Sequence, residues 1–228
     1  DNSLAAGIKT ETTGGWKLDL SNTFGINKFQ YDIKGTLNAS LEENSPTAFD
    51  AGGHSLLQNT TNFDISKNYD DVMSGFNIAF GTEFRVEKFE IFAGEEGSYT
   101  TYDTNGQPIT DPTTQSAPID PISGNPRPGS SQGFPGYSPA NEVNESRTNF
   151  SLYTDAELDV SKDFMVSGAI RFENYSDFGS TLNGKLASRY KIDDHINLRG
   201  SISTGFRAPS LAQIYYNLRF TNFNASGA

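Results

Sequence analysis

The side chains that could do chemistry in this chain are few and widely separated. The sequence has no cysteine and two histidines, of which His195 falls in a predicted tight turn and His54 in a glycine-rich stretch. Without thiols, thiolate chemistry and cysteine-based metal sites are excluded, and two separated histidines give little support for a metal or nucleophilic site. Neither histidine stands beside a serine on a strand face, as a lipase would need. We therefore predict no enzyme activity, no catalytic residue, no metal site and no cofactor.

Two acidic features resemble cation sites but have simpler explanations. Asp103-Thr104-Asn105-Gly106 begins with calcium-loop spacing, yet no glutamate follows at the required position, so an ordinary Asn-Gly turn is the better interpretation. Segment 42–75 carries six carboxylates against the single Lys67. It could bind divalent cations that bridge to lipopolysaccharide, although a solvated acidic loop is the commoner explanation.

Arg207 is the one candidate for a ligand-binding residue. It follows the alternating polar positions Asn197, Arg199, Ser201 and Ser203, which share one face of a predicted strand. A cation at the end of such a row could bind an anionic ligand or anchor a loop carboxylate. Pairing with an acidic residue of a neighbouring strand is the commoner role.

Composition excludes several classes of protein. The formal net charge of −11 argues against a nucleic-acid partner, which requires a concentrated basic surface. No apolar run approaches the roughly 18–20 residues of a membrane helix. The chain has 22 Gly, 10 Pro, 17 Phe and 10 Tyr and is 35% hydrophobic, which favours alternating strands joined by polar loops. A transmembrane β-barrel remains possible because its strands give only a weak hydropathy signal.

Alternating apolar and polar residues predict eight strands. Residues 29–41 alternate without interruption. The same pattern recurs in seven further segments: 16–24, 76–86, 89–93, 150–160, 164–172, 182–192 and 196–206. Most of these segments exceed the usual strand length of about 5–6 residues. They are long enough to cross a bilayer at a tilt.

The predicted connections alternate between short and long. Tight turns are expected at 25–27, 87–88, 161–163 and 193–195, and the other connections are 42–75, 102–147, 176–181 and the tail after 207. In an antiparallel sheet all the tight turns then lie at one end, as in transmembrane barrels with short periplasmic turns and long extracellular loops.

Aromatic residues are expected to form two bands at opposite strand ends, as interfacial girdles do, although strands favour aromatic residues in any case. The expected turn-side band is Phe24, Phe29, Phe84, Phe89, Phe164 and Tyr190, and the loop-side band is Tyr99, Tyr102, Phe172, Tyr175 and Phe178.

Two further features belong to the end of the sheet where the long loops are predicted. The adjacent Glu95 and Glu96 cannot both avoid the lipid-facing side of a strand, so that strand must have left the membrane by Glu95 or carry a bulge. Segment 102–147 holds eight of the ten prolines and cannot be a run of ladder strands. A loop of this length is usually functional or disordered.

Two passages near the C-terminus carry a family resemblance. Residues 171–181 precede Asn183-Gly184-Lys185, where a glycine replaces the proline usual in the family. The second passage, 198–215, contains Gly205-Phe206-Arg207-Ala208-Pro209-Ser210. Together they resemble the barrel of TonB-dependent outer-membrane receptors. Because Pro209 cannot donate to a ladder, the strand is expected to leave the sheet there.

The resemblance implies an all-β fold, an antiparallel transmembrane β-barrel of about 22 strands with long extracellular loops. Of that barrel, residues 1–228 are expected to supply about eight strands of one domain, as a fragment without the plug domain and the C-terminal strands. It also implies the outer membrane of a Gram-negative bacterium as the location.

The implied function is binding and active import of a scarce nutrient, by default an iron–siderophore chelate. The implied partners are outer-membrane lipid and lipopolysaccharide, the iron chelate, and the TonB complex acting through the plug. Two alternatives stay open: a self-contained passive barrel, porin or structural, and a soluble β-barrel that binds a small ligand.

Overall fold

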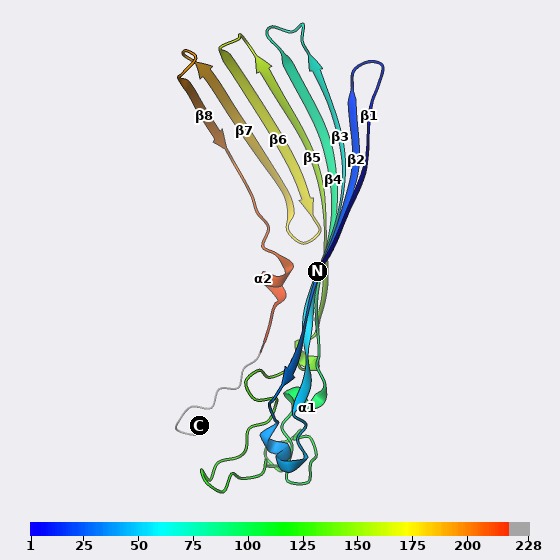
Figure 1. Cartoon of the computed structure of the whole chain (residues 1–228), viewed down its shortest axis with the longest axis vertical. Helices are drawn as coiled ribbons and strands as arrows, with labels where there is room; N and C mark the ends of the chain where they lie inside the picture. Colours follow the sequence, from blue (N-terminus) through cyan, green and yellow to red (C-terminus); the bar gives the residue numbers. More distant parts are fainter. Residues whose placement is uncertain (219–228) are drawn as a thin grey trace. The chain divides into compact units, whose positions relative to one another are not determined.

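The computed structural model describes residues 1–218, which form one eight-stranded sheet with the order β1-β2-β3-β4-β5-β6-β7-β8 (Figure 1). The strands are β1 (Asn2–Glu11), β2 (Lys17–Lys34), β3 (Ala48–Tyr69), β4 (Phe76–Phe92), β5 (Val143–Asp159), β6 (Phe164–Tyr175), β7 (Gly179–Lys191) and β8 (Asn197–Ser203). The helical elements are short: α1 (Glu96–Tyr99), α2 (Leu211–Tyr215) and the 3₁₀ turns η1 (Ala39–Asn44) and η2 (Pro139–Asn141). The all-β fold is confirmed.

Within residues 1–218 the sheet has two open edges. β1 pairs with β2 and β8 pairs with β7, and the strand order does not close on itself. A self-contained eight-stranded barrel is therefore not what these residues form. The sheet is the wall of a partial barrel.

The chain divides into two compact units. Unit 1 comprises Asp1–Ile26, Leu57–Glu87 and Ser146–Ser210, and unit 2 comprises Asn27–Leu56, Lys88–Glu145 and the segment that begins at Leu211. The segments of β2, β3, β4 and β5 that belong to unit 1 have lengths that suit tilted transmembrane strands, which need about 9–11 residues.

Unit 1 is a sheet with one apolar and one polar face. On the apolar face, large side chains such as Leu182, Leu186 and Ile202 remain 69%, 66% and 74% exposed. On the polar face, Ser151 and Glu173 are buried among hydrogen bonds. This distribution is the reverse of a water-soluble sheet and suits a wall with lipid on its apolar side.

Unit 2 has a small core of its own. Phe89, Ile91, Tyr137 and Leu211 are almost fully buried and pack together. Unit 2 also contains a buried polar cluster in which the Asn38 amide donates to the carbonyl oxygens of Gly97 and Thr100, at 2.9 and 2.8 Å. These contacts give segment 93–142 a defined fold despite its many prolines.

The turns predicted at 25–27 and 87–88 are wrong, because β2 and β4 run straight through both positions. In β4 the apolar residues change from even positions (Phe80, Phe84) to odd ones (Phe89, Ile91) at the boundary between the units. The first pair is 43% and 49% exposed and the second 1% and 2%. The pattern changes phase because the strand passes from a wall with exposed apolar residues into a packed core.

The predicted loop 42–75 is also wrong over most of its length, since β3 occupies Ala48–Tyr69. Adjacent glycines and a run of polar residues in this segment obscured the apolar–polar alternation of β3. The polar side chains are bonded across strands: the Asn22 amide donates to Asn59 Oδ1 and Thr61 Oγ1 at 3.0 and 2.8 Å. Gly52 has φ +75°, and a Cβ there would lie 2.4 Å from the Phe92 carbonyl oxygen.

β1 was missed as well, because small residues separate its two apolar residues, Leu4 and Ile8. The predicted number of strands is thus right for the wrong reason: two strands were each divided in two, and two others were not recognised.

Other sequence predictions are confirmed. Tight turns lie at 161–163 and 193–195, as predicted. The other tight connections that alternate with longer ones are 12–16 and 70–75. Short and longer connections still alternate, although 176–178 is itself short. β4 ends at Phe92, before Glu95, whose N–H donates to the Asp50 carbonyl oxygen at 2.8 Å.

The aromatic band beside the tight turns differs in membership from the predicted one. Phe24, Phe29, Phe84 and Phe89 do not lie near turns, because the turns predicted beside them do not exist. The residues that do lie there are Trp16, Tyr69, Phe76, Phe164 and Tyr190, and the Phe164 and Tyr190 rings are in T-shaped contact at 6.3 Å.

Candidate functional site

The family-signature segment Gly205–Ser210 lies outside the sheet, directly after β8 ends at Ser203. This confirms that the strand leaves the ladder, although it does so six residues before Pro209. The N–H of Thr204 donates to the Gly184 carbonyl oxygen and the Gly184 N–H donates to Thr204 Oγ1, both at 2.9 Å. These two bonds fix the point where the chain departs.

A buried arginine of β5 holds this segment. The Arg147 side chain is 3% exposed, and its Nη1 donates to the Pro209 carbonyl oxygen at 2.8 Å. Its Nε and Nη2 donate to Glu87 Oε2 of β4, at 2.9 and 2.6 Å. Asp177 lies 3.5 Å from Nη1. Arg147 therefore links two strands, the β6–β7 turn and the signature segment.

Aromatic rings surround this guanidinium. Its carbon lies 5.6 Å from the Tyr175 ring centroid and 5.7 Å from that of Phe178. The Phe206 ring contacts both rings, at 6.1 and 6.4 Å. The cation is thus enclosed by rings and carboxylates, so it anchors the segment and is not available to a ligand.

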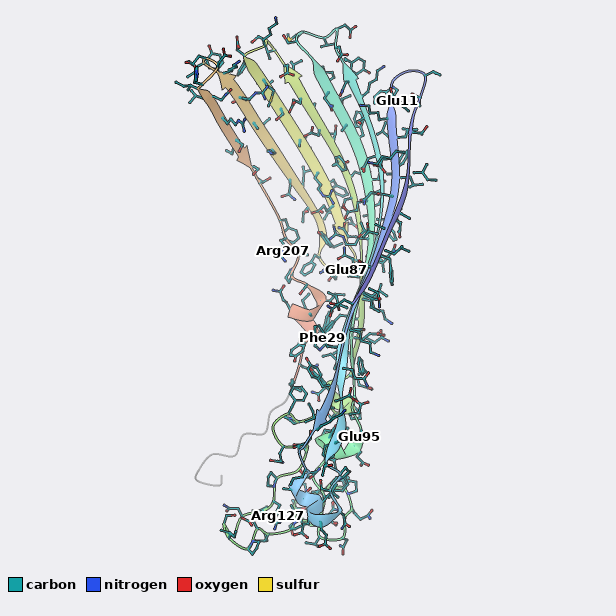
Figure 2. All side chains as sticks on the ribbon, viewed as in Figure 1. Glu11, Phe29, Glu87, Glu95, Arg127 and Arg207 are labelled. Carbon is teal, nitrogen blue, oxygen red and sulfur yellow. The ribbon has the colours of Figure 1, made fainter. Side chains whose placement is uncertain are left out.

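Arg207, the predicted candidate for ligand contact, is exposed (Figure 2). Within residues 1–218 it makes no ion pair and no hydrogen bond, so the carboxylate partner expected for it is absent there. The arginine that pairs with carboxylates here is Arg147. Arg147 could have been found from the alternating polar positions Asn149, Ser151 and Tyr153 that follow it on β5.

A second ion network crosses the polar face of unit 1. Arg171 Nη2 lies 3.2 Å from Glu83 Oε2 and Nε lies 3.0 Å from Glu173 Oε1. Arg171 also donates to Ser151 Oγ at 3.0 Å. Glu83 in turn pairs with Arg85 at 2.6 Å. These contacts link β4, β5 and β6 on the polar face.

The acidic features of the loops are turns. Asp103 Oδ1 accepts the N–H groups of Asn105 and Gln107 at 2.8 and 2.9 Å, and these hydrogen bonds hold the pKa of Asp103 below its usual range. No cluster of three or more His, Cys, Asp or Glu residues that could hold a metal occurs between residues 1 and 218. The turn predicted at Asp103-Gly106 is therefore what this segment forms.

The two histidines lie in different surroundings. His54 is part-buried among rings, with the Phe29 and Tyr31 centroids 5.3 and 6.0 Å away, and burial lowers its pKa. His195 stands 92% exposed in the β7–β8 turn, where its N–H donates to Asp193 Oδ1 at 2.7 Å.

The most exposed apolar group of unit 2 is the tip of segment 93–142. Ile122 and Ile119 are 95% and 54% exposed. A bridge between Ile119 and Pro126 closes the tip, and Asp120 Oδ2 accepts from Ser123 Oγ at 2.6 Å. The tip is therefore a defined projection that a partner or ligand can contact.

Comparison with known proteins identifies relatives. The family described as TonB dependent receptor-like, beta-barrel matches residues 1–227. Among solved structures, a G324V mutant of the ferric enterobactin receptor PfeA from Pseudomonas aeruginosa matches with a TM-score of 0.55 and 14% identity. That match covers 92% of this chain and 26% of the receptor, so the chain spans about a quarter of its length. A search of curated protein sequences finds no match. No helix within residues 1–218 has the length and hydropathy to cross a membrane.

Proposed function

Since this chain belongs to the TonB-dependent receptor β-barrel family, we propose that it forms part of an active importer in the outer membrane of a Gram-negative bacterium. Unit 1 crosses the membrane, and unit 2 lies on the cell exterior and contributes to capture of the nutrient. The nutrient is a scarce chelate, by default iron bound to a siderophore. Import uses energy delivered by the TonB complex through a plug domain.

The phase change of β4 is the observation that supports this division most strongly. In unit 1 the large apolar residues are exposed, as lipid-facing residues must be, whereas Phe89 and Ile91 of unit 2 are buried against Tyr137. Charge is absent from the middle of the apolar face of β7 and β8, where Leu186 and Ile202 are cross-strand partners. A charge in such a position costs about 2–4 kcal/mol at the bilayer midplane.

The capture role rests on the ordered tip around Ile119 and Ile122. A receptor requires loops that select the nutrient and a wall along which it passes, and unit 2 and unit 1 supply these two parts. The outer-membrane lipid and lipopolysaccharide are the proposed partners of the apolar face. Ion pairs link neighbouring strands of the wall, so it serves as a rigid scaffold.

The alternatives are weaker. The family match argues against a soluble ligand-binding barrel, and the open edges of residues 1–218 argue against a complete passive barrel. As a part of an importer, the chain is expected to have no enzyme activity.

Uptake of radiolabelled iron chelate by cells that express the full-length receptor tests the proposal. Replacing residues 120–125 with two glycines keeps the Ile119–Pro126 bridge and leaves the unit 2 core intact. We expect a loss of binding and uptake. The same replacement at 193–195, in the β7–β8 turn, is the matched control and should leave uptake unchanged.

An uncoupler of the proton-motive force separates capture from energy use. We expect it to abolish uptake while surface binding of the chelate persists. Uptake that continues with the uncoupler would contradict active import, and uptake that is unaffected by the tip replacement would refute the capture role.

A further inference from the structure

His54 of β3 is a part-buried histidine in contact with four aromatic rings of unit 2. The Phe29 and Tyr31 rings of β2 lie 5.3 and 6.0 Å from the imidazole, and the Phe89 ring of β4 lies 6.4 Å from it. The fourth ring, Tyr216, comes from the segment that follows α2 and makes a T-shaped contact at 5.9 Å. The imidazole therefore contacts both the sheet and this segment.

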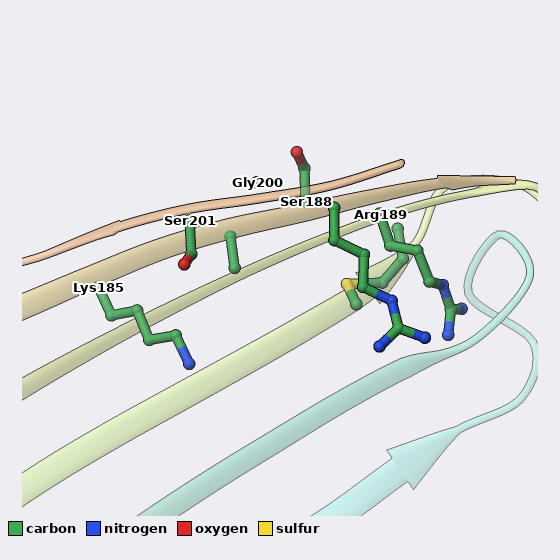
Figure 3. Close-up of a pocket in the computed structure, with 8 residues that line it drawn as sticks. Lys185, Ser188, Arg189, Gly200 and Ser201 are labelled. Carbon is green, nitrogen blue, oxygen red and sulfur yellow. The ribbon is translucent and has the colours of Figure 1, made fainter. Parts of the chain in front are cut away.

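The basic side chains of β7 and β8 have less complete surroundings. Lys185, Arg189 and Arg199 line a groove at β8, which is an open edge of the sheet within residues 1–218 (Figure 3). The groove is therefore unbounded on that side. His54 and its ring neighbours lie on β2, β3 and β4, away from that edge.

α2 and the residues after it, 211–218, are docked on the core of unit 2. The first residue of α2 is 2% exposed and packs in that core. The hydroxyl groups of Tyr137 and Tyr216 are hydrogen-bonded at 2.9 Å, and the Asn141 amide donates to Asn217 Oδ1 at 2.8 Å. Tyr216 nevertheless remains 47% exposed. The docking is therefore shallow enough to be reversed without unfolding of the strands.

One nitrogen of the imidazole suits only the neutral ring. His54 Nδ1 is buried and makes no hydrogen bond within residues 1–218. A neutral imidazole has one nitrogen without a proton, and Nδ1 can be that nitrogen, whereas an imidazolium has an N–H at both positions. Protonation therefore creates a buried donor without an acceptor, and leaving such a donor unpaired is costly.

The groups that face the imidazole do not offset a positive charge. β2 presents Tyr31, β4 presents an uncharged phenylalanine ring, and the docked segment presents Tyr216. Tyrosine is neutral below about pH 10. On the same face of β4, Glu87 is paired with Arg147, and on β3 itself Asp50 accepts from a glutamine of β2 at 3.0 Å. Burial accordingly lowers the pKa of the histidine.

We propose that His54 makes the docking of residues 211–218 sensitive to pH, so that protonation of its imidazole releases this segment from the core of unit 2. Without the Tyr216 ring beside it, the imidazolium reaches water. The docked form is fully stable above the ordinary histidine pKa of 6.5, and it loses stability as the pH falls below that value towards the lowered pKa. Release uncovers Tyr137, which is 0% exposed in the docked form.

The test is the mobility of a spin label on α2, measured by electron paramagnetic resonance in the full-length receptor in detergent. The label is attached at Ile214→Cys, because Ile214 is 43% exposed and a label there leaves the core intact. Spectra are compared at about pH 7.5 and about pH 5, on either side of the ordinary histidine pKa. We expect the ratio of mobile to immobile label to rise about tenfold at the lower pH, since one unpaired buried donor shifts an equilibrium by about that factor.

Two variants remove the titrating group in different ways. His54→Phe keeps a ring and His54→Gln keeps a polar side chain, so loss of fold in one does not affect the other. In both, the mobility ratio should be the same at the two pH values. His195→Gln removes the exposed histidine of the β7–β8 turn and should keep the full response.

A second label position separates local release from unfolding of unit 2. A label at Ile122→Cys, in the exposed tip, should show the same mobility at both pH values. The proposal is overturned if the label on α2 does not respond to pH, if both His54 variants keep the response, or if the label at Ile122 responds equally. Nutrient uptake does not enter this measurement, so its outcome is independent of the capture role.

Discussion

Replacing Arg147 with methionine should destabilise the wall and release the signature segment. Methionine keeps much of the side-chain length, so the change removes the charge and the donors and leaves most of the packing. In the protein Arg147 makes two bonds to Glu87, at 2.6 and 2.9 Å, and one to the Pro209 carbonyl oxygen, at 2.8 Å. All three disappear together.

The expected loss follows from burial. Removing one partner of a buried ion pair costs about 3–5 kcal/mol, because the remaining charge has lost its compensation. The Arg147 side chain is 3% exposed and that of Glu87 is 17% exposed, so water can partly solvate the remaining carboxylate. We therefore expect a loss of about 3 kcal/mol in the free energy of unfolding.

The assay is a guanidinium chloride titration of the full-length receptor in phospholipid vesicles, followed by tryptophan fluorescence. Arg207→Met is the matched control, because Arg207 is exposed and unpaired in residues 1–218. Its change should stay within about 0.5 kcal/mol. The double variant Arg147→Met/Glu87→Leu should recover part of the loss, since it removes the uncompensated carboxylate.

Equal effects of Arg147→Met and Arg207→Met would refute this reasoning. So would strict additivity in the double variant, since residues in direct contact couple by about 0.5–3 kcal/mol.

Three further predictions concern the loop unit and the apolar face. Asn38→Ala should cost about 1–3 kcal/mol by leaving buried carbonyl groups unpaired, and chymotrypsin cleavage after Tyr102 should increase measurably. Leu186→Lys should cost about 2–4 kcal/mol in vesicles, whereas Ala187→Lys on the polar face should not, and the same titration measures both. Burial raises the pKa of Tyr137 above its ordinary value. The stability that neutral Tyr137 contributes is therefore complete below about pH 10 and declines as pH rises through the raised pKa, which near-ultraviolet circular dichroism can follow.

The sequence was sufficient where one environment covers a whole strand. In β6, β7 and β8, exposed apolar residues alternate with polar residues from end to end. The turns at 161–163 and 193–195 were correctly predicted. Period-two alternation requires only that each face keep one environment, which holds for these strands.

The sequence was insufficient where a strand changes environment or is stabilised by residues distant in the chain. When only the sequence is considered, the phase change in β4 resembles a turn. The apolar positions shift in the same way whether a new strand begins or one strand enters a new environment. β3 depends on bonds such as that from Asn22 to Asn59, which join residues 37 positions apart. No local pattern contains that information.

The candidate site shows the same limit. Gly205-Phe206-Arg207 was recognised from the sequence, but which arginine is buried depends on the β4–β5 and β6–β7 neighbours of Arg147. Spacing along the chain does not reveal that Pro209 contacts a residue 62 positions earlier.

The measurement that tests the central claim most directly is the accessibility of single cysteines in living cells. The chain contains no cysteine, so Ile122→Cys at the loop tip and His195→Cys in the β7–β8 turn each add one labelling site to it. Both positions are almost fully exposed, at 95% and 92%. With a maleimide too large to cross the outer membrane, the account predicts labelling of Ile122→Cys in intact cells and of His195→Cys only after permeabilisation. Labelling of both in intact cells would contradict a membrane-crossing unit 1.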